Sequence, residues 1–69
     1  MERIAVFPGS FDPITVGHVD IIKRGLKIFD RIIVGIGSNA EKKYMFDLQK
    51  RETWVQQTIA SESRISVVT

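Results

Sequence analysis

The chain has 69 residues, no cysteine, one histidine and a formal net charge of +2. This length allows one small domain, and the absence of cysteine excludes disulfide bridges and a zinc site built from cysteine and histidine. The net charge is too small to indicate nucleic-acid binding, and no apolar run approaches the ~18 residues that would span a membrane. We therefore expect a cytoplasmic protein that binds neither nucleic acid nor membrane.

Three apolar runs rich in β-branched residues predict β-strands at residues 4–7, 31–36 and 65–68. The first two runs do not alternate with polar residues. That pattern indicates strands covered on both faces, as in a parallel sheet.

Two amphipathic patterns lie between these runs and predict helices. The first begins after the N-cap Thr15 and repeats apolar residues at helical spacing as far as Phe29. The second begins after the N-cap Asp47 and carries one stripe, made of Leu48, Arg51, Val55 and Ile59. We interpret Tyr44 and Trp54 as packing residues, and the charged side chains of this region as solvated, namely Arg51, Glu52 and Arg64.

The resulting order β-α-β-α-β is typical of the N-terminal half of a Rossmann-like, doubly wound parallel α/β sheet with helices on its faces. In such a sheet the first strand is central, so three strands alone would leave it as an open edge. We therefore expect residues 1–69 to form a partial domain, truncated before its C-terminal half.

The segment from Phe7 to His18, FPGSFDPITVGH, carries the candidate site. Gly9 lets the main chain approach a ligand, and Ser10 offers a hydroxyl at the carboxyl end of a parallel strand. His18 adds a ring nitrogen beside the free N–H groups of the first helical turn. With the positive end of the helix dipole, these groups suit nucleotide phosphates. A lone histidine here is more often a cap or a surface residue, so this hypothesis depends on the whole motif.

We expect three further residues of this segment to have structural roles. Phe11 can bury its ring under the loop, and the Asp12 carboxylate can bond to the backbone that follows it. Gly17 leaves room above the start of the helix.

A second glycine pattern, Gly35-Ile36-Gly37-Ser38-Asn39-Ala40, fits the dinucleotide fingerprint G-x-G-x-x-A. That fingerprint should open an amphipathic helix at once, and Glu41–Tyr44 shows no helical apolar period. We therefore interpret it as a packing feature and not as an NAD site.

The whole motif resembles the nucleotidylyltransferases, which carry T/H-x-G-H at the start of their first helix, and more narrowly the phosphopantetheine adenylyltransferase family. The matching segments are Phe7–Pro13, Thr15–His18, Asp20–Ile22, Phe29–Asp30 and Lys42–Phe46. The resemblance implies an enzyme that transfers an adenylyl group from ATP to 4′-phosphopantetheine, giving dephospho-coenzyme A and pyrophosphate. It also implies Mg²⁺ as cofactor and a cytoplasmic homo-oligomer, typically a hexamer.

The resemblance also implies residue roles. Ser10 would contact the phosphopantetheine phosphate and the nucleotide, while Phe11, through its backbone, and Gly17 would bind ATP. His18 would bind the α-phosphate region and stabilise the transition state. Lys42 would reach the pantetheine phosphate and the reacting phosphoryl group; without the resemblance it would be interpreted as a solvated loop lysine. No side chain is assigned as a metal ligand.

Two other hypotheses remain at this point. One is a cytidylyltransferase of the same superfamily, although those enzymes usually have histidine at the position of Thr15. The other is an inactive truncated fragment, or a folding module that self-associates through its open strand edge. The inactive-fragment hypothesis arises because the family's arginine-bearing segment and Ser/Thr-rich loop are not found in these 69 residues.

Overall fold

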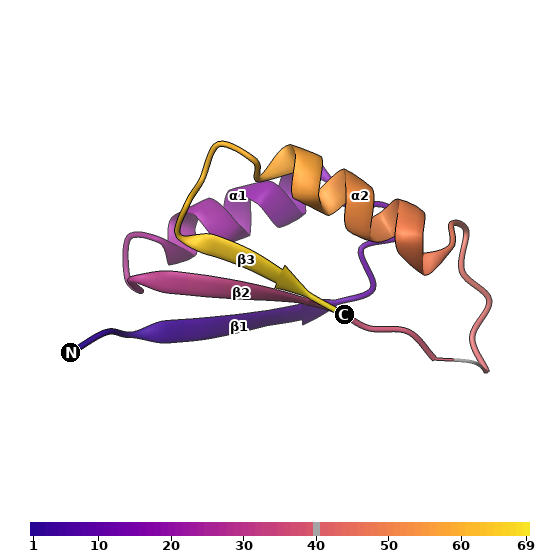
Figure 1. The fold of residues 1–69 in the computed structure, drawn as a ribbon, viewed down its shortest axis with the longest axis horizontal. Helices are drawn as coiled ribbons and strands as arrows, with labels where there is room; N and C mark the ends of the chain where they lie inside the picture. Colours follow the sequence, from indigo (N-terminus) through magenta and orange to yellow (C-terminus); the bar gives the residue numbers. More distant parts are fainter. Residues whose placement is uncertain (40) are drawn as a thin grey trace.

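The computed structural model describes residues 1–39 and 41–69, which form two layers, a three-stranded sheet and a pair of helices (Figure 1). The strands are parallel, with the second strand between the other two. The predicted half of a Rossmann-like α/β sheet is confirmed. In chain order the elements are β1 (Ile4–Gly9), α1 (Val16–Gly25), β2 (Arg31–Ile36), α2 (Leu48–Thr58) and β3 (Ile65–Val68).

Both helices lie on the same face of the sheet (Figure 1). The strand order runs in one direction, from β1 through β2 to β3, and two successive crossovers of the same hand then place their helices on one side. The expectation that the strands are covered on both faces is therefore wrong for the described part of the chain.

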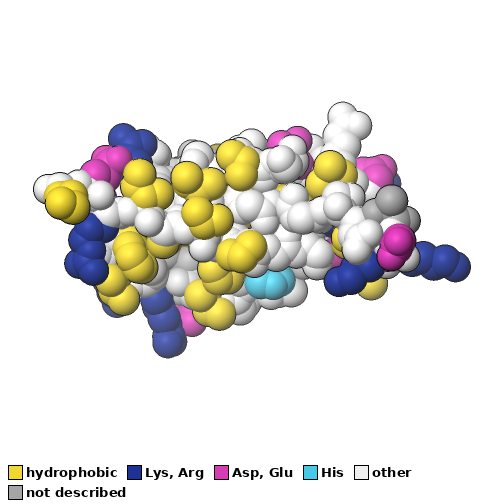
Figure 2. Space-filling view, turned by 90° about the horizontal axis from the view of Figure 1, so that it is seen from below, with side chains coloured by type: hydrophobic (Ala, Val, Ile, Leu, Met, Phe, Trp, Pro, Cys, Tyr) yellow, Lys and Arg dark blue, Asp and Glu magenta, His cyan; other side chains and the backbone are white. Residues whose placement is uncertain are grey.

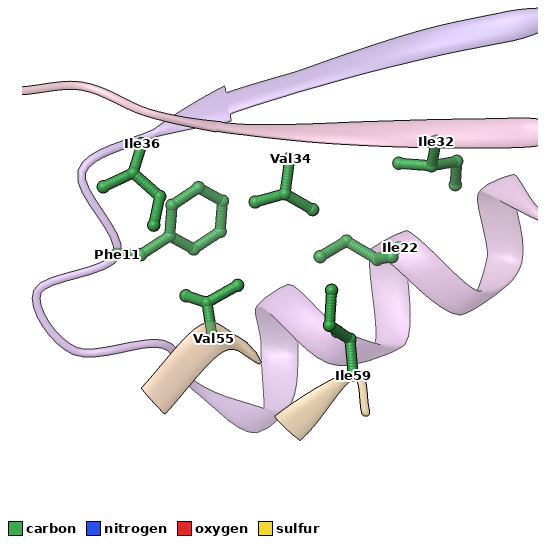
Figure 3. Close-up of a cluster of buried hydrophobic side chains, with 7 residues drawn as sticks. All are labelled: Phe11, Ile22, Ile32, Val34, Ile36, Val55 and Ile59. Atoms are coloured by element: carbon green, nitrogen blue, oxygen red, sulfur yellow. The ribbon is translucent and has the colours of Figure 1, made fainter. Parts of the chain in front are cut away.

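The buried side chains gather between the sheet and the helices (Figure 3). The central strand β2 contributes every second residue, and α1, α2 and the loop after β1 supply the rest. Each such side chain contributes roughly 1.5–3 kcal/mol when fully buried. The cluster consists of Phe11, Ile22, Ile32, Val34, Ile36, Val55 and Ile59.

The opposite face of the sheet carries apolar side chains without a helix above them. Figure 2 views the molecule from that side and shows several of them gathered over the strands. On β1, Ile4 is 51% exposed and Val6 is 63% exposed. This strand is also an edge strand in the described structure, since its hydrogen-bonded neighbour is β2.

Two element boundaries differ from the predicted ones. β1 continues through Pro8 to Gly9, which an edge strand tolerates because proline lacks only the N–H. α1 ends at Gly25 instead of continuing to Phe29. A Cβ added at Gly25 would lie 2.8 Å from Cδ1 of Ile32, so the glycine allows the end of α1 to approach β2 closely.

Candidate functional site

An open cavity of about 540 Å³ lies at the carboxyl ends of the three strands. Its wall includes Ser10 after β1, Gly37 and Ser38 after β2, and then Lys42 and Tyr44. Open α/β sheets bind their ligands in this place, because loops from neighbouring strands converge there. The cavity therefore brings together Ser10 and Lys42, which are 32 positions apart in the sequence.

The start of α1 is closed by a reciprocal pair of hydrogen bonds between Thr15 and His18. The amide of His18 donates to Oγ1 of Thr15 at 3.3 Å, and the amide of Thr15 donates to Nδ1 of His18 at 2.9 Å. An Nδ1 that accepts from an amide carries no proton. In the neutral ring the proton is then on Nε2, which is the nitrogen left to donate to a ligand. The predicted N-cap Thr15 is confirmed.

The ring of His18 packs beside the loop and is not part of the cavity wall. It lies 4.9 Å from the ring of Phe11, centroid to centroid, and it is half-buried. Phe11 is 1% exposed, and a Cβ built at Gly9 would lie 3.0 Å from its ring. The expectation that Phe11 buries its ring under the loop is confirmed.

Phe11 is also the non-glycine residue with a positive φ, 48°, in the described chain. Such a conformation is uncommon for a bulky residue and is found where the surrounding structure imposes it. The turn of the main chain at Phe11 sends its ring into the core, while Ser10 remains on the surface of the cavity.

Gly17 and Lys42 both lie on the surface. A Cβ at Gly17 would meet only Oγ1 of Thr15, at 3.6 Å, so the room expected above the helix start is present. The amide of Lys42 donates to the carbonyl of Asn39 at 3.0 Å, and Lys42 is one of the residues that line the cavity.

Asp12 has a different partner from the expected one. Its carboxylate accepts hydrogen bonds from the amides of Met45 and Phe46, the latter at 2.8 Å, and not from the backbone that follows it. The expected local turn bond is therefore wrong. Asp12 connects the loop after β1 to the segment that precedes α2, and hydrogen bonds to an ionised acceptor are the stronger kind.

Arg51 is the clearest departure from the sequence analysis, because it is buried, with 1% exposure, and not solvated. Its Nε donates to the carbonyl of Phe46 at 3.0 Å, and its Nη1 donates to the carbonyls of Ser10 at 3.0 Å and Gly37 at 2.9 Å. The guanidinium carbon also lies 4.1 Å from the centre of the Tyr44 ring. The stripe with Leu48, Val55 and Ile59 was the signal that could have revealed its burial.

Glu52 and Arg64, which were interpreted as solvated together with Arg51, are both less buried than Arg51. Arg64 is exposed and approaches Glu62 at 3.5 Å, as expected for a solvated charge. Glu52 is half-buried.

The aromatic residues around α2 pack as predicted. The Trp54 and Phe46 rings meet edge to face, with their centroids 4.6 Å apart. The Tyr44 hydroxyl accepts a hydrogen bond from the Asn39 amide at 2.8 Å.

The glycine pattern after β2 is not followed by a helix in the described residues before Leu48. Its last residue, Ala40, lies outside the described residues. The interpretation that this pattern is not an NAD site is consistent with that arrangement, because the fingerprint needs a helix N-terminus next to it.

The described residues contain no group of three or more His, Asp or Glu side chains placed to bind a metal ion. In the same part of the chain, no helix is both long and apolar enough to cross a membrane.

The cytidylyltransferase-like family matches residues 6–69 of the chain. The phosphopantetheine adenylyltransferase of Flavobacterium johnsoniae is 58% identical over 67 residues, and that of Flavobacterium psychrophilum is 56% identical over 66 residues. These matches cover 97% and 96% of this chain and 44% of each relative, so the chain spans less than half the length of these curated relatives.

A solved structure shares the fold. It is a bifunctional NMN adenylyltransferase/ADP ribose pyrophosphatase from Francisella tularensis, complexed with AMP and a manganese ion. The two chains superimpose with a TM-score of 0.81 at 24% identity, over 99% of this chain and 22% of that one. At this identity the likeness concerns the fold alone.

Proposed function

The chain belongs to the cytidylyltransferase-like family, and from that premise we propose that it contributes to adenylyl transfer from ATP to 4′-phosphopantetheine. The products would be dephospho-coenzyme A and pyrophosphate. The observation that carries the proposal is the shared cavity of Ser10 and Lys42 at the carboxyl ends of the strands. The similarity to phosphopantetheine adenylyltransferases supports the choice of substrates.

The reaction requires the protein mainly to align the two substrates and to stabilise the negative charge that develops on the phosphate oxygens. A phosphate oxygen of the acceptor attacks the α-phosphorus of ATP in line, and the bond to the departing pyrophosphate breaks. The nucleophile is already an anion, so no strong general base is required. The barrier falls through alignment of the two substrates and through donors aimed at the oxygens that gain charge.

The residues of the loop after β1 and of the cavity wall can supply these donors. We assign the Lys42 ammonium to the acceptor phosphate and the reacting phosphoryl group, and the Ser10 hydroxyl to both substrates. We assign Nε2–H of His18 to an oxygen of the α-phosphate, because Nδ1 is occupied by the Thr15 amide. The backbone of Phe11 and the open space at Gly17 complete the ATP side.

Mg²⁺ has no side-chain cage in the described residues. This ion usually keeps several waters and binds through substrate phosphates. When bound, it would be held by the triphosphate of ATP and would neutralise part of that charge, while this chain's own groups bind and orient the phosphates.

The resemblance to the family also suggests a cytoplasmic protein that assembles as a homo-oligomer, in the family typically a hexamer. We propose the same for the protein that contains these residues. Sedimentation velocity would measure the assembly directly, and a species that stays monomeric at every concentration would contradict it.

A chimaera tests the proposed reaction. Residues 1–69 would replace the matching segment of the Flavobacterium johnsoniae relative, and formation of dephospho-coenzyme A and pyrophosphate would be measured. We expect turnover within about tenfold of the parent enzyme, a difference of about 1.4 kcal/mol in barrier. A folded chimaera without product formation would overturn the proposal. Turnover with CTP in place of ATP would instead support the cytidylyltransferase hypothesis.

The exposed apolar face of the sheet favours a second candidate, a module that self-associates without catalysis. Ile4 and Val6 are more than half exposed on the edge strand β1, and such edges are templates for pairing with another chain. Calorimetric titration of the 69-residue chain with ATP and Mg²⁺ separates the two candidates. Heat of binding supports the nucleotide site, whereas no binding together with concentration-dependent oligomers supports the module.

A further inference from the structure

The mechanism above makes no use of Arg51, although this side chain is buried beside the cavity. Its partners are the main-chain carbonyls of Ser10, Gly37 and Phe46 together with the face of the Tyr44 ring. None of these partners carries a negative charge. A buried charge needs strong compensation, and an arginine satisfied only by neutral acceptors leaves a net positive charge in place.

Two of the three carbonyls belong to residues of the cavity wall, Ser10 and Gly37. In a trans peptide unit the C=O and the next N–H point in opposite directions. By holding these two carbonyls toward its Nη1, Arg51 turns the amides of Phe11 and Ser38 away from itself. In the described part of the chain, neither amide donates to another main-chain group. Ser38 lines the cavity, so its amide lies where a ligand can reach it, whereas Phe11 is buried directly behind Ser10 of the wall.

We propose that Arg51 is a positioning residue for the phosphate groups of the substrates. Its guanidinium sets the orientation of the Ser10–Phe11 and Gly37–Ser38 peptide units, and its charge raises the positive potential behind the cavity. The inference rests on the proposed function, because that function supplies the anionic ligand. It adds a residue that touches neither substrate.

The geometry of the guanidinium explains why arginine stands at this position. Nε and Nη1 reach three carbonyls in fixed directions from one planar group. A lysine would keep the charge but would present one compact ammonium, which lacks the planar fork. The Arg51→Lys variant therefore separates the effect of charge from the effect of position.

The test compares Arg51→Lys and Arg51→Met with the control Ile59→Ala in the 69-residue chain. Ile59 is also buried and lies at the C-cap of α2, and its main-chain hydrogen bonds go to Val55 and Glu62, which are not part of the cavity wall. ATP affinity with Mg²⁺ would be measured by calorimetry, and stability by urea unfolding. Amide spectra of the ligand-free proteins would follow Phe11 and Ser38.

We expect both Arg51 variants to weaken ATP binding by about tenfold or more, a change that calorimetry resolves readily. We expect Ile59→Ala to lose at least as much stability while changing affinity by less than about threefold. Unchanged affinity in Arg51→Met, or an equal loss in Ile59→Ala, would overturn the proposal. So would unfolding of both Arg51 variants while Ile59→Ala stays folded, because Arg51 would then be purely structural.

The experiment still tests the role of Arg51 if the unsubstituted chain binds no ATP. That result would count against the proposed function of the chain, and the ligand-free spectra would then decide on Arg51. Shifts of the Phe11 and Ser38 amides in Arg51→Lys, absent in Ile59→Ala, would support the positioning of the two peptide units. Unmoved amides would overturn it.

Discussion

The two loops that form the cavity are ordered in different ways. The loop after β1 is stabilised mainly by its own residues, since the Phe11 ring packs under Gly9 and the Thr15–His18 capping box closes the following helix. Arg51 adds one hydrogen bond to it, at the Ser10 carbonyl. The loop after β2 is stabilised from outside. Asp12 accepts from its amides at Met45 and Phe46, and Arg51 donates to its carbonyls.

This difference shows that the position of Lys42 depends on residues far from it in the sequence. The first loop takes its shape mainly from local hydrogen bonds and one buried ring, with a single hydrogen bond from Arg51. The second loop has few bonds of its own, among them those of Asn39 with Lys42, Glu41 and Tyr44. Changes to the first loop should therefore affect chemistry directly, whereas changes to the second should act through stability and acceptor binding.

His18→Ala should have the largest effect, because it removes the imidazole that we assign to the α-phosphate from the loop after β1. In the chimaera we expect kcat to fall by about a hundredfold or more, on the order of 3 kcal/mol in barrier, with a much smaller change in ATP affinity. Steady-state kinetics and calorimetry measure the two quantities. Thr15→Ala is the control, since it breaks the cap at a cost of about 1 kcal/mol and keeps the ring. Equal losses in rate and affinity would contradict transition-state stabilisation.

Asp12→Asn tests the connection between the two loops. It replaces an ionised acceptor of two amides, and we expect a loss of about 2 kcal/mol in the free energy of unfolding. Urea unfolding gives this number, and hydrogen exchange should speed up at Met45 and Phe46. Asp20→Asn is a matched control, because its 3.0 Å ion pair with Arg24 is exposed and contributes little. If both variants lose the same stability, Asp12 does not order the second loop.

Lys42→Ala concerns the charge that the second loop brings to the cavity. We expect the KM for 4′-phosphopantetheine to rise about tenfold, near 1.4 kcal/mol, with a lower rate as well. The neighbouring Lys43→Ala serves as control, because Lys43 is exposed and lies outside the cavity wall. An unaltered KM in Lys42→Ala would place this lysine outside the acceptor site.

Tyr44→Phe should have the smallest effect of the four. It removes the acceptor of the Asn39 amide in an exposed bond and keeps the ring under Arg51, so we expect about 0.5–1 kcal/mol of destabilisation. Faster hydrogen exchange at Asn39, with Phe46 unchanged, would confirm a local role. A loss as large as that of Asp12→Asn would show that the loop after β2 is ordered from within.

Much of the scaffold could be predicted from the residues alone. The strands at 31–36 and 65–68 and the caps Thr15 and Asp47 depend on nearest neighbours and short periodicities. The co-location of Ser10 and Lys42 was also predictable, because parallel strands bring their carboxyl ends to one edge. The assigned chemical roles of these residues remain predictions.

The hydrogen-bond partners of Arg51 and Asp12 were beyond that reasoning for a physical reason. Charged side chains are usually exposed, and they are buried only where enough hydrogen-bond partners compensate the charged group. Those partners are main-chain carbonyls and amides of segments up to 41 positions away. Main-chain groups are present at every residue, so no sequence pattern marks which of them will converge.

By itself, the sequence determined the β-α-β-α-β order, the helix starts and the residues that reach the carboxyl edge of the sheet, because these follow from local propensity and hydrophobic period. Only the tertiary structure decided which face of the sheet is covered, where α1 stops against Ile32, and that a buried guanidinium connects the cavity loops. These features depend on the summed geometry of distant segments, which short-range patterns do not encode.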